Sequence, residues 1–164
     1  MKRYLIFAGV NGAGKTTFYQ TDANVTSMPR VNVDEIVREI GTWSNANDVQ
    51  KAGRIAVRRI REYLSEGISF NQETTLCGRS IINNIEKAKA LGYRIEVFYV
   101  GLASPELAVE RVSMRVAAGG HGIPEEDIIR RYSESMKNLL YILPICDTLA
   151  VYDNTDTFRR IAVF

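Results

Sequence analysis

Residues 9–16 of this chain have the types and the spacing needed to hold a phosphate group. They read Gly-Val-Asn-Gly-Ala-Gly-Lys-Thr, which fits the pattern of Gly, four residues, Gly, Lys and Ser or Thr. Glycines let the backbone turn successive amide N–H groups onto an anion, and a helix that follows adds its own free donors. Lys15 is then a compact cation for the outer phosphates, while the Thr16 hydroxyl can hold Mg²⁺. The competing interpretation is a glycine-rich turn with an exposed lysine.

The surroundings of this loop favour the phosphate-binding interpretation. An apolar run at residues 4–8 precedes the loop, and a helix is expected from about Lys15, so the order is strand, loop, helix as the pattern requires. We therefore predict that a nucleotide is bound by the following residues: Gly9, Asn11, Gly12, Ala13, Gly14, Lys15, Thr16 and Thr17.

Asp34 follows the second apolar run and is a candidate catalytic carboxylate. In open parallel sheets ligands gather beyond the carboxyl ends of the strands, so an acid at this position is expected to face the site. Asp34 could accept the proton of a substrate hydroxyl or hold that hydroxyl in line with a γ-phosphate. The alternative is that Asp34 caps a helix at residues 35–39.

Glu73 comes after the third apolar run and is predicted to contact a metal-bound water or an acceptor hydroxyl, with Thr74 or Thr75 adding a hydrogen bond. A solvated loop acid is the alternative for Glu73. Arg79, further along the same segment, would suit an anionic acceptor, although an exposed arginine is the commoner case.

Two arginines suggest a basic lid. Arg111 and Arg115 are four residues apart, so they share one face of a predicted helix, and a glycine-rich break begins at Gly119. Arginines on a mobile flap can neutralise the charge of a transferring phosphoryl group, which predicts a lid over about residues 111–131. Any exposed helix can show this spacing as well. His121, the only histidine, is expected to order the turn or contact phosphate.

The elements that must position these residues have an α/β pattern. Between apolar runs lie stretches of helical period, including one that Ser104 and Pro105 are expected to start. The pattern predicts a mainly parallel sheet of five strands, at residues 4–8, 30–33, 68–71, 94–100 and 148–152, and weakly indicates an edge strand at residues 158–164.

Length and composition limit the function classes. The chain has 164 residues, 46% of them hydrophobic and 24% charged, and a formal net charge of +2, which predicts one globular domain over residues 1–164. Nothing in the charge pattern indicates a nucleic-acid surface, and no apolar run is long enough to cross a membrane. The two cysteines have no metal-type spacing, so we expect a reduced cytoplasmic protein. The apolar end at Phe164 raises the expectation that the native chain continues beyond it.

Together these residues resemble the zeta-toxin-like P-loop kinases, over nearly the whole chain and in the same order. The segments that carry the resemblance are residues 9–17, 31–35, 70–79, Glu110-Arg111 with Arg115, Gly119-Gly-His121 and Asp153-Asn154. The resemblance implies a doubly wound sheet with a helical lid, ATP with Mg²⁺, and phosphorylation of a hydroxyl on a small molecule. In the characterised toxins this acceptor is a UDP-activated amino sugar.

By position, the resemblance assigns the nucleotide to Lys15 and Thr16, the base role to Asp34, and an acceptor or metal contact to Glu73. Arg111 and Arg115 would belong to the lid. An antitoxin that covers the nucleotide site is a candidate partner, although no segment of this sequence indicates one.

Two alternatives stay open. One keeps the chemistry but changes the acceptor to a nucleoside, nucleotide or antibiotic hydroxyl. The other is an NTP-binding switch with slow hydrolysis, whose loaded state is recognised by a partner protein. Asp34 discriminates between kinase and switch, because only a kinase needs a carboxylate directed at an acceptor.

Overall fold

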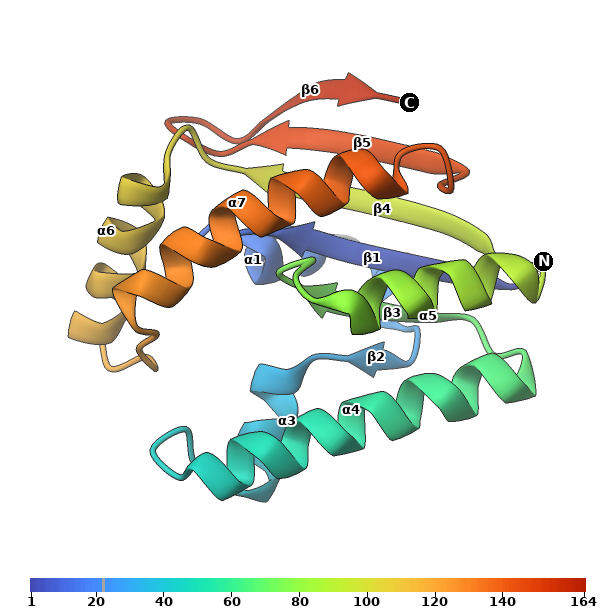
Figure 1. Cartoon of the computed structure of the whole chain (residues 1–164), viewed down its shortest axis with the longest axis horizontal. Coiled ribbons are helices and arrows are strands. Elements are labelled where there is room, and N and C mark those ends of the chain that lie inside the picture. The colour runs from blue at the N-terminus through green and yellow to red at the C-terminus, as the bar shows by residue number, and fades with distance from the viewer. Residues whose placement is uncertain (22) are drawn as a thin grey trace.

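The computed structural model describes residues 1–21 and 23–164, apart from the side chains of residues 23 and 24. Its strands form one sheet of six in the order β2-β3-β1-β4-β5-β6 (Figure 1). The first five strands of the chain pair in parallel, and β6 runs antiparallel to β5 at the sheet edge. The strands are β1 (Arg3–Gly9), β2 (Arg30–Val31), β3 (Phe70–Thr74), β4 (Arg94–Gly101), β5 (Thr148–Asp153) and β6 (Arg159–Val163).

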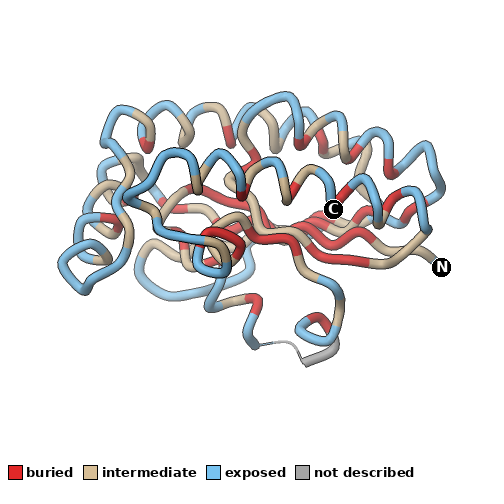
Figure 2. Tube along the Cα trace, turned by 90° about the horizontal axis from the view of Figure 1, so that it is seen from below, coloured by how far each residue is buried: buried red, intermediate tan, exposed pale blue. Residues whose placement is uncertain are grey.

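In the described part of the chain, helices cover both faces of the sheet, and Figure 2 shows the buried strands as a layer between them. Side chains from α4, α5 and α7 form the main core on one face, while α1 and α2 pack on the other. The helices are α1 (Lys15–Tyr19), α2 (Ala23–Thr26), α3 (Val33–Ile40), α4 (Ala46–Glu66), α5 (Arg79–Ala90), α6 (Pro105–Ala117) and α7 (Glu125–Ile142).

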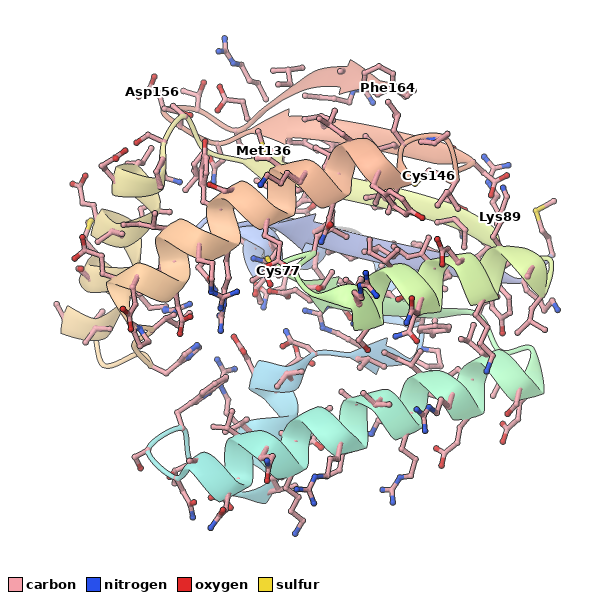
Figure 3. The ribbon with its side chains drawn as sticks, viewed as in Figure 1. Cys77, Lys89, Met136, Cys146, Asp156 and Phe164 are labelled. Atoms are coloured by element: carbon pink, nitrogen blue, oxygen red, sulfur yellow. The ribbon has the colours of Figure 1, made fainter. Side chains whose placement is uncertain are left out.

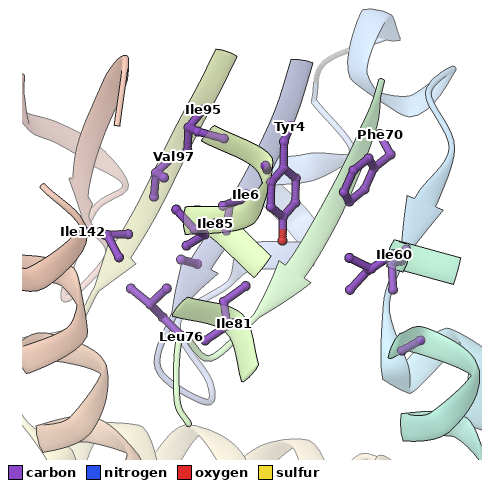
Figure 4. Close-up of a cluster of buried hydrophobic side chains, with 14 of the residues drawn as sticks. Tyr4, Ile6, Ile60, Phe70, Leu76, Ile81, Ile85, Ile95, Val97 and Ile142 are labelled. Atoms are coloured by element: carbon purple, nitrogen blue, oxygen red, sulfur yellow. The ribbon is translucent and has the colours of Figure 1, made fainter. Parts of the chain in front are cut away.

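Strand β1 lies at the centre of the sheet, and it reads as a continuous apolar run because both of its faces are covered. On the main core side, Tyr4 stacks on Phe70 of β3 with ring centroids 4.4 Å apart. Figure 4 shows this pair in one cluster with Ile85 of α5 and Ile142 of α7, all of them buried. Because β1 is packed along its whole length, it holds the loop after Gly9 in a defined position at the carboxyl edge of the sheet.

The structure confirms the α/β class and the mainly parallel sheet, but the sheet has six strands rather than the five predicted. The extra strand is β6, which pairs with β5 in the segment that weakly indicated an edge strand. Strand β2 is also shorter than predicted, because Asn32 already caps α3 and its side-chain oxygen accepts the Asp34 N–H at 2.9 Å. The alternative role of Asp34 as a helix cap is therefore wrong.

The predicted lid region comprises the second half of α6, residues 118–124 and the first turns of α7. Helix α6 begins as the sequence predicts: the Ser104 hydroxyl accepts the Leu107 N–H at 3.2 Å, and Pro105 is the first helical residue. Arg111 and Arg115 follow in the second half of the same helix, about one turn apart.

The two cysteines lie apart and neither forms a disulfide (Figure 3). Cys77 lies in the segment between β3 and α5, where burial raises the pKa of its thiol. Cys146 follows α7 and donates to the Ile142 carbonyl. Within the described residues, none of the helices has the length and apolar character needed to span a membrane.

Candidate active site

The loop between β1 and α1 needs glycine at three positions. Gly9, Gly12 and Gly14 all have positive φ, at 145°, 76° and 91°. A Cβ atom at Gly9 would lie 2.1 Å from the Val100 carbonyl oxygen of β4, so this glycine also permits close strand contact. Asn154, just after β5, donates to the Ala13 carbonyl at 2.9 Å and ties the loop to the carboxyl end of β5.

Lys15 is folded into this loop rather than exposed to solvent. Its Nζ donates to the Val10 carbonyl oxygen at 2.9 Å, and the residue is 8% exposed. Burial lowers the pKa of Lys15, while the nearby Glu73 and Asp34 carboxylates act in the opposite direction. A buried cation beside a backbone carbonyl can exchange that carbonyl for a phosphate oxygen.

Thr16 and Glu73 meet at the edge between α1 and β3. The Thr16 hydroxyl lies 2.8 Å and 3.0 Å from the two carboxylate oxygens of Glu73. Glu73 also accepts hydrogen bonds from Arg30 and, at 3.1 Å, from the Asn32 amide. The Glu73 carboxylate is thus held in one orientation, which a solvated loop acid would not be.

Arg30 is a site residue that the sequence analysis missed. Its guanidinium bonds to Glu73, Glu35 and Asn71, and it lies over the Tyr19 ring at 3.5 Å from the centroid. The Arg30 and Glu73 side chains are only 9% and 10% exposed. A lone arginine at the start of a short strand carries no sequence signal, because its partners come from three other elements, α1, α3 and β3.

Asp34 lies on α3, opposite the lid. Its carboxylate is partly exposed, and Oδ2 is 3.6 Å from His121 Nε2. His121 in turn stacks on the indole of Trp43, a residue that no sequence pattern singles out. The lid turn therefore contacts the α3 side of the site.

The two lid arginines have different partners. Arg111 donates to the Thr155 carbonyl at 2.7 Å, and its Cβ would lie 3.0 Å from a Cβ at Gly12, so α6 packs closely on the loop. Arg115 donates toward His121, and its Nε is buried with no hydrogen-bond partner among the described residues. Arg130 of α7 donates hydrogen bonds to Asp127 and Glu134 of its own helix.

These residues surround one cavity of about 860 Å³. Most of the predicted site residues line it: Asn11, Gly12, Gly14, Lys15, Thr16, Thr17, Asp34, Glu73, Thr75, Arg111 and Arg115. Gly9 and Ala13 belong to the loop but not to the lining, and Ala13 is fully buried. Arg79 is exposed at the start of α5 and does not line the cavity.

The oxygen donors at this edge fit a hard divalent cation. Thr16 and Glu73 offer a hydroxyl and a carboxylate side by side, which is the chemistry that Mg²⁺ prefers. The described residues contain no group of three or more His, Cys, Asp or Glu side chains arranged for a metal.

The sequence of this chain is similar to those of known bacterial proteins. An uncharacterized protein of Haemophilus influenzae is 30% identical over 128 residues, covering 78% of this chain and 91% of its own. A shikimate kinase of Enterococcus faecalis is 30% identical over 110 residues, covering 66% and 64%.

Two solved structures have a similar fold. One comes from the PezAT chromosomal toxin-antitoxin system of Streptococcus pneumoniae, with a TM-score of 0.67, 17% identity, and coverage of 99% of this chain and 72% of that chain. The other is the AvrRxo1-ORF1:-ORF2 complex with ATP, with a TM-score of 0.73, 15% identity, and coverage of 99% and 58%. The chain thus spans less than two thirds of the shikimate kinase and of the AvrRxo1 chain.

One protein family matches most of the chain. The sequence pattern of the AAA domain family AAA_33 matches residues 5–139, a range that contains most of β1, the glycine-rich loop, Asp34, Glu73, Arg111 and Arg115. The chain belongs to this family, and its fold is that of a P-loop kinase-like domain.

Proposed function

We propose that this protein is an ATP-dependent kinase of zeta-toxin-like type, which transfers the γ-phosphoryl group to a hydroxyl of a small molecule. One observation supports this most: the Lys15, Thr16 and Glu73 group lines the same cavity as the Asp34 carboxylate and Arg115. A nucleotide-binding switch needs the first group but has no use for a carboxylate across from it.

The glycine-rich loop and Lys15 would bind the triphosphate. Lys15 would give up the Val10 carbonyl and take a phosphate oxygen, at little cost because it is already desolvated. The free N–H groups at the start of α1 add donors to the same oxygens. The similar AvrRxo1 structure that contains ATP supports ATP as the nucleotide.

Thr16 and Glu73 are the residues that would hold Mg²⁺. When bound there, Mg²⁺ would neutralise charge on the β- and γ-phosphate oxygens. Arg30 and Asn32 keep the Glu73 carboxylate next to the Thr16 hydroxyl, so the two donors need not be assembled during binding.

Asp34 would act on the acceptor. Its carboxylate would accept the proton of the acceptor hydroxyl as that oxygen forms a bond to the γ-phosphorus and the bond to the ADP oxygen breaks. Arg115 would neutralise charge on the equatorial oxygens, and the lid turn would keep water from competing with the acceptor.

The acceptor to test first is a UDP-activated amino sugar, which is what the zeta-toxin resemblance implies. The shikimate kinase relative makes a hydroxy acid the second candidate. Arg115 and Arg131 line the cavity and would suit the anionic part of either compound.

The experiment is incubation with ATP, Mg²⁺ and a panel of nucleotide sugars, hydroxy acids, nucleosides and antibiotics, followed by mass spectrometry. The proposal predicts a mass gain of one phosphate on one compound class, and no gain with the Lys15→Ala variant. ADP release without any phosphorylated acceptor would instead favour the switch.

An antitoxin partner is a separate part of the proposal, supported by the similarity to the PezAT structure. If this kinase is a toxin, its induced expression in a bacterium arrests growth, and Lys15→Ala expressed to the same level does not. Equal growth of both cultures would remove the reason to search for an antitoxin.

A further inference from the structure

The turn between α6 and α7 carries the only histidine of the chain, and this side chain contacts two other elements. The His121 ring stacks on the Trp43 indole, with centroids 4.0 Å apart and planes inclined by 8°. Its Nε2 is 3.3 Å from Arg115 Nη2 and 3.6 Å from Asp34 Oδ2. Although the turn lies at the surface, the His121 side chain is only 10% exposed.

The backbone of the turn produces this placement. Gly119 has a φ of +87°, and the Gly120 N–H donates to the Arg115 carbonyl at 2.9 Å. A Cβ at Gly120 would lie 2.6 Å from Arg115 Cγ. The chain therefore folds back over Arg115, and the imidazole that follows meets the guanidinium of the same arginine.

From this geometry we infer that His121 is a positioning residue, which sets Arg115 and Asp34 for phosphoryl transfer, with Trp43 as the platform that fixes the imidazole plane. The inference rests on the proposed kinase function and adds a residue that links the predicted lid to the proposed base, Asp34. His121 itself exchanges no proton with the acceptor.

The chemistry follows from the single nitrogen that faces both partners. When the imidazole is neutral with its proton on Nδ1, Nε2 accepts a hydrogen bond from Arg115, and Asp34 keeps its charge for the acceptor hydroxyl. When the imidazole is protonated, Nε2 donates to Asp34 and the positive ring repels Arg115. The neutral form is therefore the working form.

The surroundings of the ring favour the neutral form. Burial is the main cause that lowers the pKa of His121 below its ordinary value. Asp34 of α3 raises this pKa, whereas Arg115 of α6 and Arg38 of α3 lower it. The Trp43 indole adds no charge. Acid pH would convert the ring to the form that pairs with the base.

A first experiment requires neither substrate nor activity. Because the chain has one histidine, the proton NMR signal of its imidazole C2–H reports the His121 titration directly. The inference predicts a midpoint below about 6.5, the ordinary histidine value. Asp34→Asn should lower this midpoint further, and Arg115→Met should raise it. A midpoint at the ordinary value that neither substitution moves would overturn the inference.

A second experiment separates positioning from folding, with thermal unfolding as the check on each variant. His121→Ala should lower kcat by about tenfold or more with the KM for ATP unchanged. His121→Gln offers Arg115 an amide oxygen at a similar reach and does not titrate. It should regain most of kcat and move the acid limb of the pH–kcat profile to lower pH.

Trp43 provides a matched pair of variants for the platform. Trp43→Phe keeps an aromatic face and should lose less kcat than Trp43→Ala, which should behave as His121→Ala does. An unmoved acid limb in His121→Gln would overturn the inference even when phosphoryl transfer is intact. Absence of transfer in the wild type, with the NMR shifts as predicted, would overturn the proposed kinase function alone.

Discussion

At the residue scale, the Glu73 carboxylate is held by three side chains from different elements. Thr16, Arg30 and Asn32 all bond to it, and the Arg30–Glu73 ion pair is almost fully shielded from water. An ion pair in such a place contributes little net stability, but removing one partner leaves a buried charge without compensation.

We therefore expect Arg30→Met to lower the free energy of unfolding by about 3–5 kcal/mol. The measurement is urea unfolding of the single variants Arg30→Met and Glu73→Gln and of the double variant. The double variant should lose less than the sum of the two single losses.

Arg58→Met is the matched control, because the Arg58–Glu62 pair is exposed, with side chains 70% and 55% accessible. This change should alter stability by less than about 1 kcal/mol. Two results would contradict the role assigned to the buried pair. One is an equal loss of unfolding free energy in Arg58→Met and Arg30→Met. The other is a loss in the double variant equal to the sum of the losses in Arg30→Met and Glu73→Gln.

At the element scale, α6 begins at a side-chain cap and carries both arginines of the predicted lid. The Ser104 hydroxyl caps the Leu107 N–H, one of the amide groups that have no partner inside the helix. The far end of the same helix carries Arg115 and leads into the turn over it.

Ser104→Ala should lower the free energy of unfolding by about 1 kcal/mol, because it leaves one helix donor without its cap. The check is denaturant unfolding beside Ser113→Ala, whose exposed side chain lies within the same helix. Alanine has the higher helix propensity, so the Ser113 variant should be neutral or slightly stabilised. Equal losses in both variants would show that the cap is not the cause.

At the scale of the whole molecule, the features predictable from sequence were those fixed by local pattern. The glycine-rich loop followed an apolar strand, and parallel strands share one carboxyl edge, so Asp34 and Glu73 were expected at the same edge as Lys15. The structure has all three around one cavity. The start of α6 was likewise visible in Ser104 and Pro105.

The features that could not be predicted depend on contacts between distant segments. Arg30 belongs to the site because it contacts Tyr19, Asn71 and Glu73. Trp43 belongs to it because His121 stacks on its indole. Neither residue has a period or spacing that indicates these partners. Strand β6 was weakly signalled because its residues are mostly exposed, so no alternation of buried and exposed positions marks it.

The central claim is that a nucleotide-binding loop and an acceptor-directed carboxylate act within one cavity. The most direct test is Asp34→Asn, which keeps the shape of the side chain but removes its capacity to take a proton. ATP affinity by calorimetry and phosphorylated acceptor by mass spectrometry are measured on the same protein. The account predicts ATP binding within about twofold of wild type and a loss of transfer of at least about 10²-fold. Transfer that continues at the wild-type rate in Asp34→Asn would contradict it.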